Sequence, residues 1–145
     1  MRDPIYLDYN ATTPVAPEVL DAMFPWLRDQ FGNPSSTHPW GRRAAQAVAT
    51  ARHQVADLIG AQPQEIVFTG CATEANNIAL LGVAAQALAG RRHLVVSAIE
   101  HPAVMQPALH LQRSGWDLSI VPVDSRGRVS AAAVDRALRP DTALV

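Results

Sequence analysis

The residues best suited to chemistry stand in two short segments that each join an expected strand to an expected helix. In the first segment, Phe68–Glu74, Gly70 and Ala72 leave the backbone accessible, and Thr73 adds a hydroxyl group. A helix that begins directly after a strand presents unpaired N–H groups and the positive end of its dipole, which is suited to binding an anion such as phosphate. The alternative is an ordinary tight turn in which Thr73 only caps its helix.

The second segment, Ser97–Pro102, brings His101 to the start of the next helix. Ligands of doubly wound sheets bind outside the carboxyl ends of the strands, so His101 is expected at the same edge as Thr73. An imidazole placed there can stack on a planar aromatic cofactor and exchange protons near neutral pH. The alternative is a histidine that only caps its helix.

The elements that must position these residues alternate between short β-branched segments and helices with one apolar side. Strands are expected at 65–68, 94–96, 118–123 and from 142 onward. A first helix is expected to begin at Pro17, and a second helix to end at Leu58 with Gly60 as its C-cap. Three more helices are expected at 73–88, 101–113 and 130–138. This alternation predicts an α/β fold with a mostly parallel sheet and helices on its faces. Pro25 within the first helix predicts a kink or break. The last residues read as the start of a strand, so the sheet is expected to be incomplete and the chain truncated.

The composition is that of an ordinary globular protein, with a formal net charge of -1 and 48% hydrophobic residues. Near-neutral charge gives no electrostatic case for nucleic acid or a membrane surface as a partner. The single cysteine excludes an internal disulfide framework and fits a reducing compartment. The N-terminus lacks a signal-peptide pattern, and no apolar run approaches membrane-spanning length, so a cytoplasmic location is expected.

Several other residues invite a functional interpretation, but a structural one is simpler. Cys71 is expected to be a small buried residue rather than a redox group. The remaining histidines lack metal-ligand spacing, which predicts no metal site. These histidines, expected at the surface or on helix flanks, are His53, His93 and His110. The tryptophans, expected as core or interface anchors, are Trp26, Trp40 and Trp116.

Four segments together resemble, in order and spacing, the N-terminal part of the cysteine desulfurases. They read IYLDYNATTP, FGNPSSTH, EIVFTGCATEANN and SAIEHPAV. The resemblance is closest to the group that serves iron–sulphur cluster assembly and nitrogenase maturation, and it covers about the first third of such an enzyme. It implies the three-layer large domain of fold type I pyridoxal phosphate enzymes, incomplete here. Residues 1–15 would form an N-terminal arm and 16–145 part of the cofactor-binding domain.

The resemblance also implies roles for individual residues. Ala72 and Thr73 would bind the cofactor phosphate, and His101 would stack on the pyridine ring and act in catalysis as a proton-transfer group. The residues implied near the substrate or the dimer interface are Asn10, Asn33 and His38. The parent reaction converts L-cysteine to alanine and leaves sulphur as a persulfide on the enzyme. The implied partners are a sulphur acceptor or iron–sulphur scaffold protein and a second copy in a homodimer.

The chain contains no lysine, because all 12 of its Lys+Arg residues are arginine. Pyridoxal phosphate is normally held as a Schiff base on a lysine amine. The resemblance places that lysine and the persulfide-forming cysteine downstream, so the chain is expected to be inactive alone. Two alternatives stay open. One is a part of another class V pyridoxal phosphate enzyme, such as a selenocysteine lyase or an aminotransferase. The other is a non-catalytic dimerisation or binding remnant.

Overall fold

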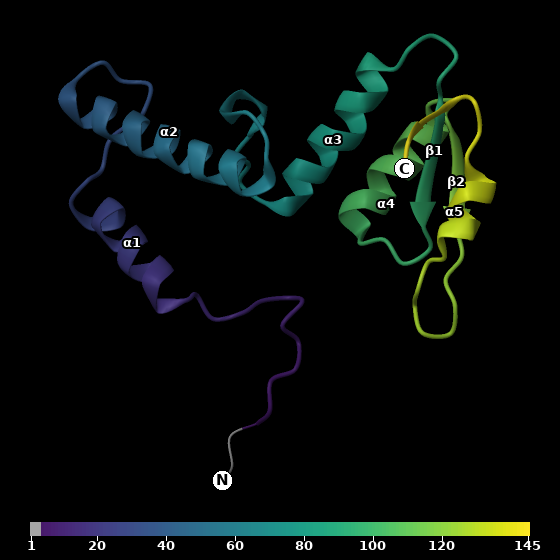
Figure 1. Ribbon diagram of the computed structural model, residues 1–145, viewed down its shortest axis with the longest axis horizontal. Helices are drawn as coiled ribbons and strands as arrows, with labels where there is room; N and C mark the ends of the chain where they lie inside the picture. Colours follow the sequence, from purple (N-terminus) through teal and green to yellow (C-terminus); the bar gives the residue numbers. More distant parts are fainter. Residues whose placement is uncertain (1–3) are drawn as a thin grey trace. The chain divides into compact units, whose positions relative to one another are not determined.

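The computed structural model describes residues 4–145 and divides the chain into two compact units, Met1–Val67 and Phe68–Val145. Figure 1 shows the elements in chain order. The helices are α1 (Pro17–Arg28), α2 (Pro39–Ile59), the short 3₁₀ helix η1 (Pro63–Glu65), α3 (Ala72–Gln86), α4 (Pro102–Arg113) and α5 (Ala131–Ala137), and the strands are β1 (His93–Ser97), β2 (Asp117–Val121) and β3 (Thr142–Leu144).

The first unit contains the two helices α1 and α2. Helix α1 runs through Pro25 without interruption, so the expected break does not occur. A proline removes only one N–H donor, and the Pro25 carbonyl still accepts the amide of Asp29 at 2.9 Å. Helix α2 ends at Gly60, whose φ of 69° confirms the expected glycine C-cap.

The loop before α2 folds tightly against the first turn of that helix. A Cβ atom on Gly41 would lie 2.2 Å from the carbonyl oxygen of Ser36 and 2.7 Å from that of Asn33, so only glycine fits there. The Asn33 side chain accepts the amide of Ser35 at 2.9 Å, which forms an Asx turn. The shape of this loop therefore depends on local backbone contacts.

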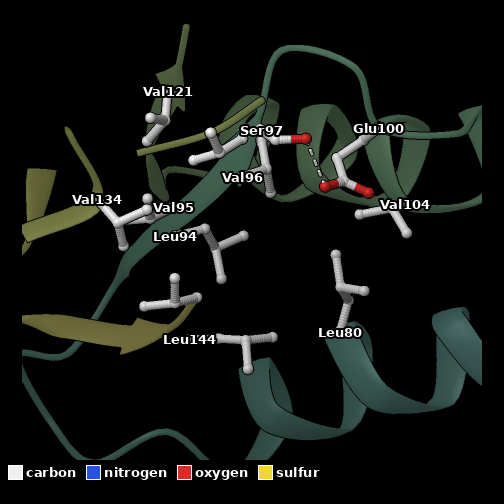
Figure 2. A pocket seen from close by; sticks show the side chains of 12 residues that line it. Leu80, Leu94, Val95, Val96, Ser97, Glu100, Val104, Val121, Val134 and Leu144 are labelled. Carbon is white, nitrogen blue, oxygen red and sulfur yellow. Dashed lines mark hydrogen bonds between the residues drawn. The ribbon is translucent and has the colours of Figure 1, made fainter. Parts of the chain in front are cut away.

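The second unit is built on a parallel sheet in the order β2–β1–β3. Leu94 of β1 packs in a core with Leu80 of α3 and Leu111 of α4. Val95, the next residue, faces the opposite side, where Val134 of α5 lies beside it (Figure 2). Helices therefore cover both faces of the sheet, which confirms the predicted α/β fold class. Trp116 is buried in this core, as expected.

The expected strand at 65–68 is the element that sequence reasoning placed wrongly. Residues 63–65 form η1 instead, and residues 66–69 belong to no helix or strand. A β-branched segment becomes a strand only where a neighbour pairs its amide and carbonyl groups, and this segment has no such neighbour in the sheet of β1, β2 and β3. The expected strands at 94–96 and 118–123 are confirmed to within two residues.

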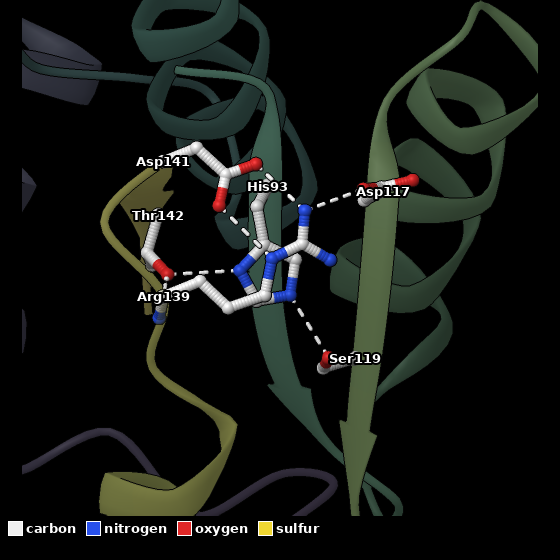
Figure 3. A network of polar contacts seen from close by, with 6 residues as sticks. All are labelled: His93, Asp117, Ser119, Arg139, Asp141 and Thr142. Atoms are coloured by element: carbon white, nitrogen blue, oxygen red, sulfur yellow. Dashed lines mark hydrogen bonds and ion pairs between the residues drawn. The ribbon is translucent and has the colours of Figure 1, made fainter. Parts of the chain in front are cut away.

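The amino ends of the three strands are joined by His93 (Figure 3). Its side chain is fully buried, so the expectation of a surface histidine was wrong. Nδ1 lies 2.8 Å from the hydroxyl of Thr142 on β3, and Nε2 lies 2.8 Å from the hydroxyl of Ser119 on β2. Thr142 Oγ1 also accepts the amide of Arg139 at 2.8 Å. Each ring nitrogen of His93 therefore has a hydroxyl partner, which can either donate or accept.

Charged groups close this end of the sheet above His93. The Arg139 guanidinium binds both carboxylate oxygens of Asp141, at 2.9 and 2.6 Å, and one oxygen of Asp117 at 2.5 Å. Burial lowers the pKa of His93, and the positive charge of Arg139 lowers it further, against the opposing effects of the two carboxylates. A neutral imidazole, hydrogen-bonded at both ring nitrogens, therefore connects the three strands.

Candidate functional site

The first turn of α3 is open at its N-terminus. Its N-cap residue, Cys71, is extended with φ of -165° and ψ of 166°, and its side chain makes no capping hydrogen bond. The first intrahelical bond runs from the Ala75 amide to the Cys71 carbonyl at 3.2 Å. The amides of Ala72, Thr73 and Glu74 therefore have no acceptor within the helix, and they point outward at the positive end of the helix dipole.

The turn that leads into α3 is braced by its own side chains. The Glu74 carboxylate accepts the Gly70 amide at 2.7 Å, so this amide is not available to a ligand. The Asn77 side chain donates to the Thr73 carbonyl at 2.8 Å. Cys71 is exposed rather than buried, which corrects the expectation for this residue. A small flanking residue at a chain turn has no core to enter, because the apolar side of α3 begins one turn later.

The first turn of α4 is closed by His101. This residue is the N-cap, and its Nδ1 accepts the amide of Ala103 at 3.0 Å. Because Nδ1 is the acceptor, the proton of the neutral imidazole sits on Nε2, at the far side of an exposed ring. His101 therefore does cap its helix, and the same bond fixes which nitrogen it presents.

Thr73 and His101 line one pocket between α3 and α4. The pocket has a volume of about 470 Å³, within the range of roughly 300–1,000 Å³ typical of small-molecule sites. Its lining residues are Thr73, Asn77 and Leu81 from α3 and His101, Pro102, Ala103, Gln106, Pro107 and His110 from α4. The structure thus brings together the two candidate residues that the sequence placed at one sheet edge, with Ala72 directly before Thr73.

The chemistry of this pocket follows from its two helix starts. Free amides and a hydroxyl on α3 suit a phosphate group, and an exposed imidazole on α4 offers an aromatic face and one N–H donor. These are the features that the phosphate and the ring of pyridoxal phosphate need for non-covalent binding. A lysine for covalent attachment is absent from the sequence.

The other three candidates lie in the first unit, where each has a local structural role. Asn10 is exposed in a turn over which the Tyr6 hydroxyl donates to the Asp8 carbonyl at 2.8 Å. Asn33 shapes the loop before α2 through the Asx turn described above. His38 caps α2, since its Nδ1 accepts the Gly41 amide at 3.2 Å. Their closeness to a substrate stays a prediction.

Sequence reasoning missed the residues that continue the pocket along both helices. Asn77 and Leu81 follow Thr73 at intervals of four residues, and Gln106 and His110 follow Pro102 in the same way. Residues four apart lie on one face of a helix, so this spacing could have identified two facing stripes. It could not have shown that the stripes face each other.

Within residues 4–145, no helix is both long and apolar enough to cross a membrane. No group of three or more histidine, cysteine, aspartate or glutamate side chains in that range is arranged to hold a metal ion.

The chain matches a known protein family. Residues 5–145 match the model described as aminotransferase class-V. The chain is 43% identical over 145 residues to a cysteine desulfurase IscS of Dictyoglomus turgidum, a match that covers all of this chain and 37% of that protein. It is 44% identical over 143 residues to a cysteine desulfurase of Homo sapiens, covering 98% of this chain and 31% of that protein. The chain thus spans about a third of the length of these relatives.

Solved structures give the same result. A NifS-like protein superposes with a TM-score of 0.86 at 39% identity, over 95% of this chain and 38% of that one. A structure described as SspA in complex with cysteine superposes with a TM-score of 0.84 at 43% identity, over 94% of this chain and 40% of that one. Sequence and structure therefore agree on the same group of relatives.

Proposed function

Because the chain belongs to the class V aminotransferase family, we propose that it is the N-terminal, cofactor-binding part of a pyridoxal phosphate-dependent cysteine desulfurase. Residues 16–145 contribute to the large domain, and residues 1–15 form an arm. The relatives that the chain matches are named cysteine desulfurases, which supports this member of the family over a selenocysteine lyase or an aminotransferase.

The observation that carries the proposal is the pocket shared by Thr73 and His101. The open first turn of α3 binds the cofactor phosphate through the amides of Ala72 and Thr73 and through the Thr73 hydroxyl. His101 stacks its imidazole on the pyridine ring and holds its exchangeable proton at Nε2. When bound, pyridoxal phosphate supplies an electron sink for bond breaking in the substrate amino acid.

The substrate and partners follow from the same assignment. L-cysteine gives alanine and an enzyme-bound persulfide. The outer sulphur of this persulfide passes to a sulphur acceptor or an iron–sulphur scaffold protein in iron–sulphur cluster biogenesis. The enzyme acts as a cytoplasmic homodimer. One similar structure is described as a complex with cysteine, which supports this choice of substrate. Asn10, Asn33 and His38 approach the substrate or the dimer interface.

The chain alone cannot complete the reaction, because it has no lysine amine to hold the cofactor and its one cysteine sits in the phosphate turn. Borohydride reduction in the presence of pyridoxal phosphate should therefore leave every side chain unmodified, as read by mass mapping of peptides. The α-amine is the one group of the chain that can form a reducible imine. A stable adduct on any side chain would overturn this part of the proposal.

Cys71 offers a direct test of phosphate binding, since it is the single thiol of the chain and the N-cap of α3. Pyridoxal phosphate should slow its alkylation by iodoacetamide, and inorganic phosphate should do the same at higher concentration. Thr73→Val should raise the concentration needed for half protection by about fivefold, the value of one hydrogen bond of roughly 1 kcal/mol.

Thr50→Val is the matched control, because Thr50 is exposed on α2 in the first unit and plays no part in the pocket. It should leave the protection of Cys71 as it is in the parent chain. Equal alkylation rates with and without pyridoxal phosphate would reject the cofactor assignment. Protection that does not respond to inorganic phosphate would reject the role of the phosphate turn.

A further inference from the structure

The segment that carries His101 is short and is held at three points. The link from Ser97, the end of β1, to Pro102, the start of α4, is pinned at one end where the Ala98 amide donates to the Val121 carbonyl at 2.8 Å. It is pinned at the other end by the His101 cap. Between these points, Ile99 is 59% exposed, so packing does not hold the middle of the link.

The middle of the link is held by one side-chain hydrogen bond. The Ser97 hydroxyl donates to Oε1 of Glu100 at 2.7 Å (Figure 2). Both residues are half-buried. A hydrogen bond to a carboxylate is among the stronger kinds, and low-polarity surroundings strengthen it further. The backbone position of Glu100, and with it the direction in which the next residue leaves, therefore depends on this bond.

The surroundings of Glu100 are mostly apolar. Its carboxylate lies between Ser97 and Val104, at a cavity of about 310 Å³. The residues that line this cavity are Leu80, Leu94, Val95, Val96, Ser97, Glu100, Val104, Val121, Val129, Val134, Leu144 and Val145, among which Glu100 has the only charged side chain. Desolvating a charge beside apolar groups costs free energy that an apolar residue would avoid.

We propose that Glu100, held by Ser97, is a positioning residue for His101. The Ser97–Glu100 bond keeps the link in the conformation in which Nδ1 of His101 accepts the Ala103 amide and Nε2 carries the proton. This inference rests on the proposed function only for the role of His101 toward the cofactor. The positioning itself is a property of the chain without ligand.

The test reads the His101 ring directly in the purified, ¹⁵N-labelled chain, by long-range ¹H–¹⁵N correlation spectra. These spectra distinguish a protonated from an unprotonated ring nitrogen, and His101→Asn identifies the His101 signals by their loss. Ser97→Ala and Glu100→Ala should lower the ratio of the Nε2–H to the Nδ1–H tautomer by about fivefold, because losing one hydrogen bond of roughly 1 kcal/mol releases the link. Ser97→Thr and Glu100→Gln keep the donor and the acceptor and should restore the parent ratio.

Ser130→Ala is the matched control, since the Ser130 hydroxyl caps α5 in the same unit and its loss removes one serine hydrogen bond away from His101. It should lower the melting temperature and leave the His101 signals unchanged. If Ser97→Ala or Glu100→Ala unfolds the unit, Glu100→Asp takes its place, because its shorter arm cannot reach Ser97 from the same backbone position.

Parent-like ring signals in Ser97→Ala and Glu100→Ala would overturn the proposal, and so would an equal change of the ratio in Ser130→Ala. Failure of the proposed function gives a different result. In that case pyridoxal phosphate would not protect Cys71 in the parent chain, whereas the ring signals of the ligand-free chain would still respond to Ser97 and Glu100.

Discussion

Strand β1 has a histidine at its start and another soon after its end, and their surroundings are opposite. His93 is fully buried, and both ring nitrogens are bonded to hydroxyls on the neighbouring strands. His101 is exposed and lines the pocket, and only one of its ring nitrogens is used, as the cap of α4. The amino edge of the sheet is therefore closed and self-satisfied, whereas the carboxyl edge leaves polar groups available.

The difference shows how the same type of side chain, an imidazole, serves a structural purpose at one edge and a ligand-facing purpose at the other. At the amino edge, the imidazole completes the hydrogen bonding of three strands and has no capacity left for a ligand. At the carboxyl edge, each open group has a neighbour that holds it in place. Asn77 braces Thr73, and the cap bond to Ala103 orients His101. A binding site needs polar groups that are free to hydrogen-bond a ligand, held in place by neighbours whose own hydrogen bonds are complete.

The largest expected effect concerns the carboxyl edge in a complete desulfurase built on this chain. His101→Ala should slow alanine release from L-cysteine by a factor of about 10²–10⁴, the range for a positioned acid or base. His101→Asn keeps an N-cap oxygen and should be slowed as much, which would assign the loss to the ring rather than the cap. Turnover at the parent rate with cofactor fully bound would make His101 a capping residue only.

The next effect concerns the amino edge. His93→Ala should reduce the free energy of unfolding by about 2–4 kcal/mol, because it opens a cavity and leaves the hydroxyls of Ser119 and Thr142 without their partner. Urea denaturation of the chain measures this. His93→Gln retains a donor and an acceptor on one side chain and should lose less. Equal stability of parent and His93→Ala would remove the distinction between the two edges.

The third prediction concerns a substitution that adds a capping side chain at the N-terminus of α3. Cys71→Asp should place a capping carboxylate at the α3 N-terminus and stabilise the chain by about 1 kcal/mol. It should weaken phosphate binding by at least about tenfold, since two anions cannot share the same amides. Melting curves and competition between phosphate and pyridoxal phosphate measure the two effects. Cys71→Ser, a neutral cap, is the control and should weaken binding less.

The smallest effect is a pH dependence that belongs to the amino edge. The pKa of His93 is lowered in the folded chain from an ordinary value of 6.5, so the unfolded chain takes up the proton first as pH falls. The contribution to stability is complete above pH 6.5 and declines below it, by at most about 1.4 kcal/mol per pH unit for one proton. Urea midpoints between pH 7 and pH 5 test this.

His93→Gln should flatten that pH dependence, and His101→Asn should not. The carboxylates with lowered pKa values, Asp124 and Asp141, lose their contribution only as pH falls below 3.8, so they do not interfere in this range. A decline of the same slope in His93→Gln would show that His93 is not its source.

Sequence reasoning reached much of the carboxyl edge because its signals are local. An expected strand, small residues and a helix start led to Thr73, although the structure has no strand there. The same pattern led to His101, which does follow a strand, β1. Glu100 was not recognised, since nothing in its neighbourhood distinguishes a surface carboxylate from one that faces an apolar cavity. The strand expected at 65–68 was wrong for a related reason, because pairing depends on a neighbour that local residues do not specify.

The sequence by itself determined the alternation of helices and strands from α3 onward, the two helix starts, the four motifs that carry the family resemblance, and the absence of a lysine. These are properties of single residues and short spacings, which local backbone preferences translate directly into structure. The tertiary structure decided that His93 is buried and bonded on both sides while His101 is not, and that Thr73 and His101 line one pocket. Burial and contact between distant segments depend on how the layers pack, and packing joins residues that no short spacing relates.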